Sequence, residues 1–251
     1  MRHIDRPAHA FDADFHKGGA GSGNHGHAGR PGEVGGSAPD GDGNATSTHD
    51  LPAKFKAYAH DLKAQAEKND PVVTPVLQVV AHSLGGQMVG LEHRIKLNTE
   101  RMAQKMAENA TEANLTPEQA RESVYDALRY TVELDPQQYA EGAQSTLAAL
   151  RERGFEVYDS KDKNYWDENS TYRGLNYVMA DKAGNKFELQ FHTKESLAAK
   201  ERVHKIYEKF RAPGVTPEQR KIYATQMLGE WKGVTFPRGV EKLGRKVVQT
   251  A

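Results

Sequence analysis

Cysteine is absent from all 251 residues of the chain. Without thiols the protein can form neither a disulfide framework nor a thiolate metal site. A surplus of charge is absent too, because 34 Lys and Arg balance 34 Asp and Glu, so no global basic field indicates a nucleic-acid partner. No apolar run is long enough to span a bilayer, and the polar N-terminus does not resemble a signal peptide. These absences predict a cytoplasmic protein with no membrane partner.

Residues 1–50 contain almost nothing apolar to bury. The run KGGAGSGNHGHAGRPGEVGGSAPDGDGN is rich in Gly, Ser, Asn and Pro, so burial cannot offset the chain entropy that folding removes. Six of the eleven histidines of the chain lie in this part, but their irregular spacing is weak support for a metal site. We therefore expect a disordered Gly/His-rich leader over residues 1–50.

The stretch VVAHSLGGQ, residues 79–87, differs by one residue from the G-x-S-x-G turn that presents a nucleophilic serine in lipases and esterases. That turn requires a strand before the serine. Here apolar residues recur at helical spacing from Val73 to Leu84, which predicts a helix around Ser83. The motif therefore does not indicate a serine hydrolase. We expect the Gly85-Gly86 pair to let two helices approach closely or to break one.

Helical and strand periodicities alternate along the remaining chain. The expected elements are helices over 51–70 and 74–83, a short helix from 117 to about 125, a strand over 128–134, a helix over 136–153, strands over 155–158, 172–180 and 186–193, a helix over 195–211 and a last helix from 217 to about 231. This order predicts an α+β domain with a small mixed β-sheet flanked by helices. Helices over 51–84 would precede it, and a basic, loosely docked tail over 233–251 would follow.

The strand FELQFHT, residues 187–193, has two different faces. Side chains alternate in a strand, so Glu188, Gln190 and His192 share the face opposite to Phe187 and its apolar neighbours. On periodicity alone, a solvated sheet face explains this polar row best. The alternative is that the row belongs to a site.

Cations near two acids, Asp126 and Glu188, favour the site. The cations are Arg94, Lys96, Arg101 and Lys105, expected on one helix, Lys161 and Lys163 in a loop, and the polar stripe of Lys200, His204, Tyr207 and Arg211. Mg²⁺ takes one or two carboxylates together with phosphate oxygens, and cations neutralise the charge of a transferred phosphoryl group. The combination indicates polyphosphate chemistry.

Six segments in order carry a family resemblance: HRIK, DALRYT, KDKNYW, TYRGLN, FELQFHT and AAKERVHKIYEKFR. Over residues 85–211 the chain resembles the synthetase domain of RelA/SpoT-type pyrophosphokinases, which make (p)ppGpp in the stringent response. It is most similar to the divergent versions of phages and prophages, and its leader resembles a linker of phage head-morphogenesis proteins. The resemblance implies a nucleotidyltransferase-like domain over 85–232 without a hydrolase module. It also implies Mg²⁺-dependent transfer of the β,γ-pyrophosphate of ATP to the 3′-hydroxyl of GDP or GTP.

The resemblance further implies a role for each matching residue. The catalytic acids and Mg²⁺ ligands would be Asp126 and Glu188. The phosphates of ATP would be bound by Arg94, Lys96 and Lys105. The acceptor would be bound by Tyr172, whose ring stacks on the base, together with Lys161, Lys163 and Asn176. The pocket would be supported by Arg129, Gln190, His192, His204 and Tyr207.

The chain departs from the family pattern near the phosphates. Arg129 stands in the place of a glycine, while Thr131 and His192 stand in the places of arginines. Two alternatives to the alarmone synthetase therefore stay open. One is a toxin-type variant whose acceptor is an adenine nucleotide or the 3′ end of tRNA. The other is a catalytically degenerate binding or structural module of a phage particle, tethered through the leader and associated with the virion.

Overall fold

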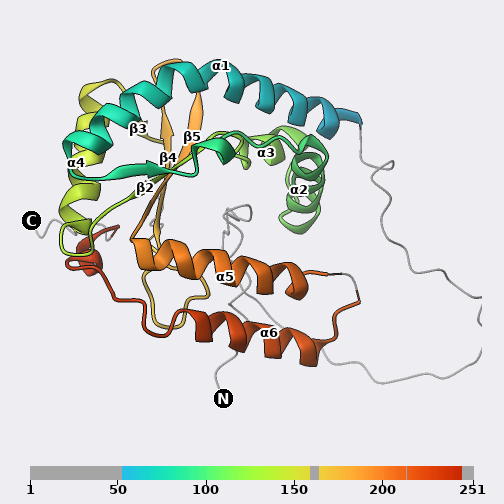
Figure 1. Ribbon diagram of the computed structural model, residues 1–251. Helices are drawn as coiled ribbons and strands as arrows, with labels where there is room; N and C mark the ends of the chain where they lie inside the picture. The colour runs from blue at the N-terminus through green and yellow to red at the C-terminus, as the bar shows by residue number, and fades with distance from the viewer. Residues whose placement is uncertain (1–52, 159–163, 213, 245–251) are drawn as a thin grey trace, which may run out of the picture.

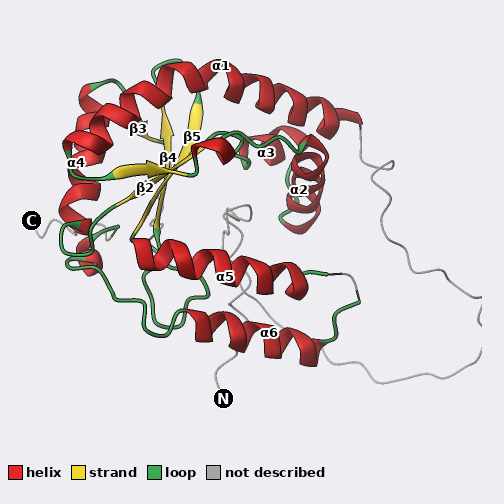
Figure 2. Cartoon of the chain, in the orientation of Figure 1, coloured by secondary structure: helices red, strands yellow, loops and turns green. Residues whose placement is uncertain are grey.

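The computed structural model describes residues 53–158, 164–212 and 214–244 (Figures 1 and 2). In chain order the elements are α1 (Ala53–Ser83), β1 (Gln87–Val89), the 3₁₀ helix η2 (Leu91–His93), α2 (Thr99–Glu112), α3 (Pro117–Glu122), β2 (Arg129–Glu133), α4 (Tyr139–Glu152), β3 (Glu156–Val157), β4 (Leu175–Ala180), β5 (Lys186–His192), α5 (Lys194–Phe210), α6 (Pro217–Glu230) and the 3₁₀ helix η3 (Val240–Lys242). The leader predicted over 1–50 lies outside the described residues.

The strands form one five-stranded mixed sheet in the order β1-β2-β5-β4-β3. β2 and β5 are parallel, and the other neighbouring pairs are antiparallel. The prediction of an α+β fold with a small mixed sheet flanked by helices is confirmed. The four predicted strands are present with shorter bounds. β1 was not predicted, because its three residues are too few to show a period of two.

One face of the sheet forms the hydrophobic core. Phe187, Leu189 and Phe191 of β5 and Tyr130 of β2 are buried, and α1 and α4 cover them. Tyr139 of α4 donates a hydrogen bond to the carbonyl of Phe191 at 2.6 Å. Burial of each large apolar side chain contributes roughly 1.5–3 kcal/mol. This face fixes the strands, and therefore fixes the polar side chains that alternate onto the other face.

α1 is a single helix of 31 residues, so the prediction of two helices separated at Asp70-Pro71 is wrong. Pro71 and Pro75 both lie inside it. Prolines in a helix interior remove a hydrogen bond and normally end or kink the helix. Here the buried stripe runs on past them, from Ala66 through Val73 to Leu77, so packing of this face against the core overrides the local preference.

Ser83 is the last residue of α1, which confirms the helix predicted at this position and excludes the strand-turn-helix of a nucleophile elbow. Its hydroxyl donates to the carbonyl of Val80 at 2.9 Å. Gly85 breaks the helix with a positive φ of 71°. The close approach is made by Gly86 to β2 and not to a second helix, because a Cβ there would lie 3.1 Å from the carbonyl oxygen of Glu133.

The described part of the C-terminal tail, residues 233–244, packs closely instead of docking loosely. Val234, Val240 and Leu243 are buried in the core. The amide of Asn164 donates to the carbonyls of Val240 at 2.7 Å and Leu243 at 3.0 Å. Apolar burial fixes this segment although its sequence shows no regular period. Among the residues described, no helix combines the length and the apolar character that crossing a membrane requires.

Candidate functional site

Asp126 lies just before β2 and is clamped by two lysines. The segment of Arg94 to Lys96 runs antiparallel to the residues after Asp126, because the amide of Lys96 donates to the carbonyl of Ala127 at 3.0 Å. This register brings the ammonium of Lys96 onto Oδ2 of Asp126. Lys105 reaches from α2 to Oδ1 at 3.3 Å. The prediction that all four upstream cations share a helix is wrong: only Arg101 and Lys105 lie on α2.

Charge and burial compete at this clamp. Burial alone would raise the pKa of the Asp126 carboxyl, but Lys105, Lys96 and Arg129 together hold that pKa well below its usual range, so the carboxylate is ionised. Burial lowers the pKa of the Lys96 ammonium to about 7, although Asp126 acts in the opposite direction. The cations gathered around this carboxylate suit the binding of phosphates.

Glu188 is the second buried acid, and polar side chains surround it. Its oxygens accept from the amide of Asn176 at 3.3 Å and from the amide of Gln190 at 3.2 Å. Glu188, Gln190 and His192 are 2%, 0% and 0% exposed, so the interpretation of this row as a solvated sheet face is wrong. The row is an enclosed polar layer between the sheet and α5. Buried groups of this kind are retained at a cost in desolvation, which favours a functional role.

Arg129 links the two acids. Its Nη1 lies 3.8 Å from Oε2 of Glu188, and its charge also lowers the pKa of Asp126. Arg129 pairs with Glu188 in the register of the parallel strands β2 and β5. Of the side chains predicted as catalytic, Glu188 therefore lies on β5, and Asp126 lies in the segment that leads into the neighbouring strand β2.

The number of acids agrees with a magnesium ion that arrives with phosphates. Within the described ranges, no group of three or more His, Asp or Glu side chains could hold a metal by itself. Mg²⁺ needs only one or two carboxylates when phosphate oxygens complete its shell. Asp126 and Glu188 supply that number, whereas a site made of protein ligands alone would need more acids.

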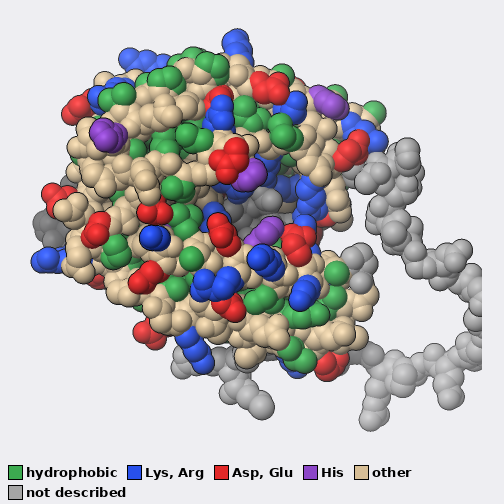
Figure 3. All heavy atoms as spheres, viewed as in Figure 1, with side chains coloured by type: hydrophobic (Ala, Val, Ile, Leu, Met, Phe, Trp, Pro, Cys, Tyr) green, Lys and Arg blue, Asp and Glu red, His purple; other side chains and the backbone are tan. Residues whose placement is uncertain are grey.

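A cleft of about 980 Å³ opens between α5 and the sheet. The cations in its wall are Arg101, Arg129, Lys194, Lys200, Lys205 and Arg211, and the acids are Glu92, Glu133, Glu201 and Glu208. Figure 3 shows the hollow on this face, with Lys and Arg around it and His side chains beside them. The volume suits a nucleotide-sized ligand, and the excess of cations suits an anionic one. His204 and Tyr207, predicted as supporting residues, also line this cleft.

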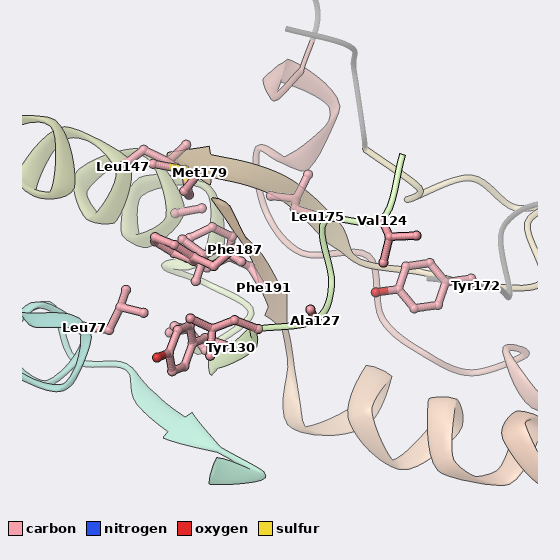
Figure 4. Close-up of a cluster of buried hydrophobic side chains, with 14 of the residues drawn as sticks. Leu77, Val124, Ala127, Tyr130, Leu147, Tyr172, Leu175, Met179, Phe187 and Phe191 are labelled. Carbon is pink, nitrogen blue, oxygen red and sulfur yellow. The ribbon is translucent and has the colours of Figure 1, made fainter. Parts of the chain in front are cut away.

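Tyr172 borders the cleft, yet its ring is only 1% exposed. Its hydroxyl donates to Oδ1 of Asn176 at 2.8 Å and lies 2.9 Å from Nε2 of His192. In Figure 4 the hydroxyl oxygen points toward the strands. This arrangement departs from the expectation that the ring lies open for stacking. Asn176 is buried behind it, between Tyr172 and Glu188.

Arg94 faces away from these acids. Its guanidinium makes two hydrogen bonds to Asp70 of α1, at 2.5 and 2.7 Å. Arg94 therefore anchors the segment that carries Lys96. Lys161 and Lys163, predicted to contact the acceptor, lie outside the described residues.

Lys200 was predicted only as one cation of the polar stripe, and Asp70 was not predicted to have a role. Lys200 donates to Oε1 of Gln190 at 2.8 Å, and burial together with Arg129 lowers the pKa of its ammonium to about 7. The polar stripe on α5 contained this signal. Asp70 was interpreted only as a helix end, since no local pattern connects it with Arg94, which lies 24 residues away.

Comparison with known proteins gives structural neighbours only. No family model matches the sequence, and no curated protein matches it. The type VI effector Tas1, solved with its immunity protein, matches at 18% identity and a TM-score of 0.44 over 70% of this chain and 95% of the other. Small alarmone synthetase 1 from Bacillus subtilis, bound to its product pppGpp, matches at 14% identity and 0.44 over 73% and 97%. The protein smu.1046c from Streptococcus mutans UA159 matches at 15% identity and 0.41 over 72% and 88%. Similarities this low assign no activity, so function is argued from the residues of the chain itself.

Proposed function

We propose that the protein is an ATP-dependent pyrophosphokinase that transfers the β,γ-pyrophosphate of ATP to the 3′-hydroxyl of GDP or GTP. One observation carries the proposal: two buried acids, Asp126 and Glu188, share Arg129, and the cleft that Arg129 lines is rich in cations. The order of the sequence motifs supports the same activity. Transfer forms a bond from the 3′-oxygen to the β-phosphorus and breaks the bond between that phosphorus and the α,β-bridging oxygen, which releases AMP.

The residues take distinct parts in this reaction. Asp126 and Glu188 would hold Mg²⁺, which neutralises phosphate charge when bound. Lys96 and Lys105 bind the phosphates of ATP, because their ammonium groups already lie beside Asp126. Arg129 stabilises the negative charge that develops on the transferred group. Because Arg94 is held by Asp70, we assign it to anchoring Lys96.

The test is transfer of label from ATP labelled at the γ-phosphate. Purified protein with Mg²⁺ is incubated with GDP, GTP, ATP alone or deacylated tRNA, and the products are separated from inorganic phosphate. We expect label on GDP or GTP with stoichiometric release of AMP. Labelled tRNA, or a labelled product that carries the pyrophosphate on the 3′-oxygen of an adenine nucleotide, would instead identify the toxin-type alternative.

The variants Asp126→Asn and Glu188→Gln keep the shape of each acid and remove its charge. Each should lower transfer at least 100-fold, in line with the loss of one catalytic electrostatic group. The matched control is Glu141→Gln, an exposed acid on α4, which should transfer at the wild-type rate. Folded wild-type protein that transfers label to none of the acceptors would favour the degenerate binding module.

A further inference from the structure

A continuous chain of buried hydrogen bonds ends at Glu188. Nδ1 of His192 lies 3.0 Å from Oγ of Ser196, and Nε2 of His192 lies 2.9 Å from the hydroxyl of Tyr172. That hydroxyl contacts Oδ1 of Asn176 at 2.8 Å, and Nδ2 of Asn176 contacts Oε1 of Glu188 at 3.3 Å. All five side chains are buried. The chain therefore connects the start of α5 with the proposed catalytic acid.

The direction of each hydrogen bond follows from the last acceptor. Oε1 of Glu188 accepts from Nδ2 of Asn176, which leaves Oδ1 of Asn176 to accept from the hydroxyl of Tyr172. Tyr172 has one hydroxyl proton, which goes to Asn176, so its oxygen accepts from Nε2–H of His192. Nδ1 of His192 then carries no proton and can accept from the hydroxyl of Ser196, for which the carbonyl of Thr193 at 3.1 Å is a second acceptor. Burial keeps His192 neutral by lowering its pKa well below the usual range, which agrees with a ring that carries a single proton.

The same packing closes the ring of Tyr172. Tyr165, His192 and Trp231 surround it edge-on, with ring centroids 5.4, 5.5 and 6.4 Å away. The ammonium of Lys200 lies over the ring, 5.9 Å from its centroid. A nucleobase that stacked on Tyr172 would have to displace these neighbours. The ring of Tyr172 is therefore covered on several sides, while its hydroxyl is held by hydrogen bonds. This geometry favours a role for the hydroxyl and disfavours stacking of the ring on a base.

We propose that Tyr172 is a positioning residue whose hydroxyl, held by His192 and passed on through Asn176, fixes the carboxylate of Glu188 for catalysis. The inference rests on the proposed function, and it assigns the acceptor base to another wall of the cleft. Gly174 supports it, because a Cβ at this position would lie 2.8 Å from Cε1 of His192 and 3.0 Å from the Tyr172 hydroxyl. Only glycine leaves room for the contact between these two side chains.

Kinetics of Tyr172→Phe separate positioning from stacking. Phenylalanine keeps the ring and removes the hydroxyl, so positioning predicts a kcat lower by about 10-fold to 100-fold with the KM for the acceptor nearly unchanged. The control is Tyr139→Phe, which also removes a buried hydroxyl, one that donates to the Phe191 carbonyl on the core face. Tyr139→Phe should keep the wild-type kcat and lose only stability.

A second substitution tests the same contact from the backbone side. Gly174→Ala should lower kcat as Tyr172→Phe does, and the double variant should lose no more than either single variant, because both break one contact. A wild-type kcat in Tyr172→Phe, together with a tenfold higher acceptor KM in Tyr172→Leu, would overturn the inference in favour of stacking.

Nitrogen-15 NMR of His192 gives a readout that does not depend on turnover. The hydrogen-bond order requires a proton on Nε2 and none on Nδ1, and Tyr172→Phe should shift the Nε2 resonance. Protonation of Nδ1 instead would contradict the order. If the wild-type protein transfers no pyrophosphate, the proposed function is refuted, and so is a role of the Tyr172 hydroxyl in catalysis. The NMR measurement still tests the order of the hydrogen bonds in that case.

Discussion

Asp70 holds three side chains from different parts of the fold. Its carboxylate accepts from Arg94, from the hydroxyl of Thr74 at 2.6 Å and from the hydroxyl of Tyr130 at 2.9 Å. These bonds connect α1 with β2 and with the segment before Lys96. The Arg94 hydrogen bonds hold the pKa of Asp70 down at about 2 against the effect of burial. One carboxylate therefore fixes the strand segment that delivers a lysine to Asp126.

Replacement of Asp70 by asparagine should destabilise the protein by about 2 kcal/mol at pH 7, because the charged hydrogen bonds to Arg94 are lost. Above pH 4 the contribution of Asp70 is fully present. It is lost as the pH falls from the unfolded pKa of 3.8 to the folded pKa of about 2, since the unfolded state binds more protons in this window. Urea unfolding of wild type and variant at several pH values measures the difference.

Asp61→Asn is the matched control on the same helix. Asp61 pairs with Arg121, but its side chain is 51% exposed, so its removal should cost no more than about 1 kcal/mol. If the difference in the free energy of unfolding between wild type and Asp70→Asn stays constant below pH 4, the ion pair of Asp70 and Arg94 does not account for it.

α1 illustrates how tertiary contacts override local preference. Pro71 and Pro75 interrupt the backbone hydrogen bonds of a helix whose buried side still packs on α2 and α4. Both prolines lie on the exposed side, where their rings disturb no packing. The helix therefore continues because the stripe around Leu77 stays buried. The two prolines still lower the stability of the helix, so replacing one of them should raise the stability of the protein.

Pro75→Ala should stabilise the protein by about 1–2 kcal/mol. Alanine restores a helical hydrogen bond worth part of the roughly 3 kcal/mol penalty of an interior proline, while the more flexible unfolded chain takes back about 0.4–1 kcal/mol. Denaturant unfolding with an unchanged m-value measures the gain. Pro217 is the control: it is the first residue of α6, where proline fits the helix, so Pro217→Ala should bring no gain. A gain of the same size at both positions would contradict the explanation.

The fold was largely predictable from the sequence, because the strands and the helices after residue 116 carry clear periods and capping boxes. Capping boxes at Thr116 and Thr216 begin the two helices that were predicted from residues 117 and 217. The contacts of the candidate site were not predictable. Its contacts depend on the sheet register, which pairs Arg129 with Glu188 across 59 positions of the chain. No local pattern encodes such a pairing, so the bond of Arg94 to Asp70 and the enclosure of Tyr172 could not be predicted.

Across the molecule, residues of α5 line one side of the cleft, and residues of β1, η2, α2 and β2 line the other. A nucleotide bound there touches both sides and should stabilise the fold. ATP with Mg²⁺ at about 100 times its Kd should add about 2.7 kcal/mol, which raises Tm by about 5 °C or more for a chain of this size. Thermal unfolding with and without ligand measures the shift.

Mg²⁺ alone should leave Tm unchanged, because Lys96 and Lys105 occupy both oxygens of Asp126. In Asp126→Asn the additional shift that Mg²⁺ brings to ATP should disappear. A large shift with Mg²⁺ alone would show that the two acids bind the metal without phosphates.

The closure of the site by the C-terminal segment has a consequence for biosynthesis. Trp231 packs against Tyr172, and the carbonyls of Trp231 and Val234 are held by Arg173, at 3.1 and 3.4 Å. On the ribosome, residue 172 is made long before residues 231 to 243. A chain that has not yet reached Trp231 lacks the ring that packs against Tyr172. We therefore expect a fragment that ends before Trp231 to transfer pyrophosphate more slowly than the full chain, as Tyr172→Phe should.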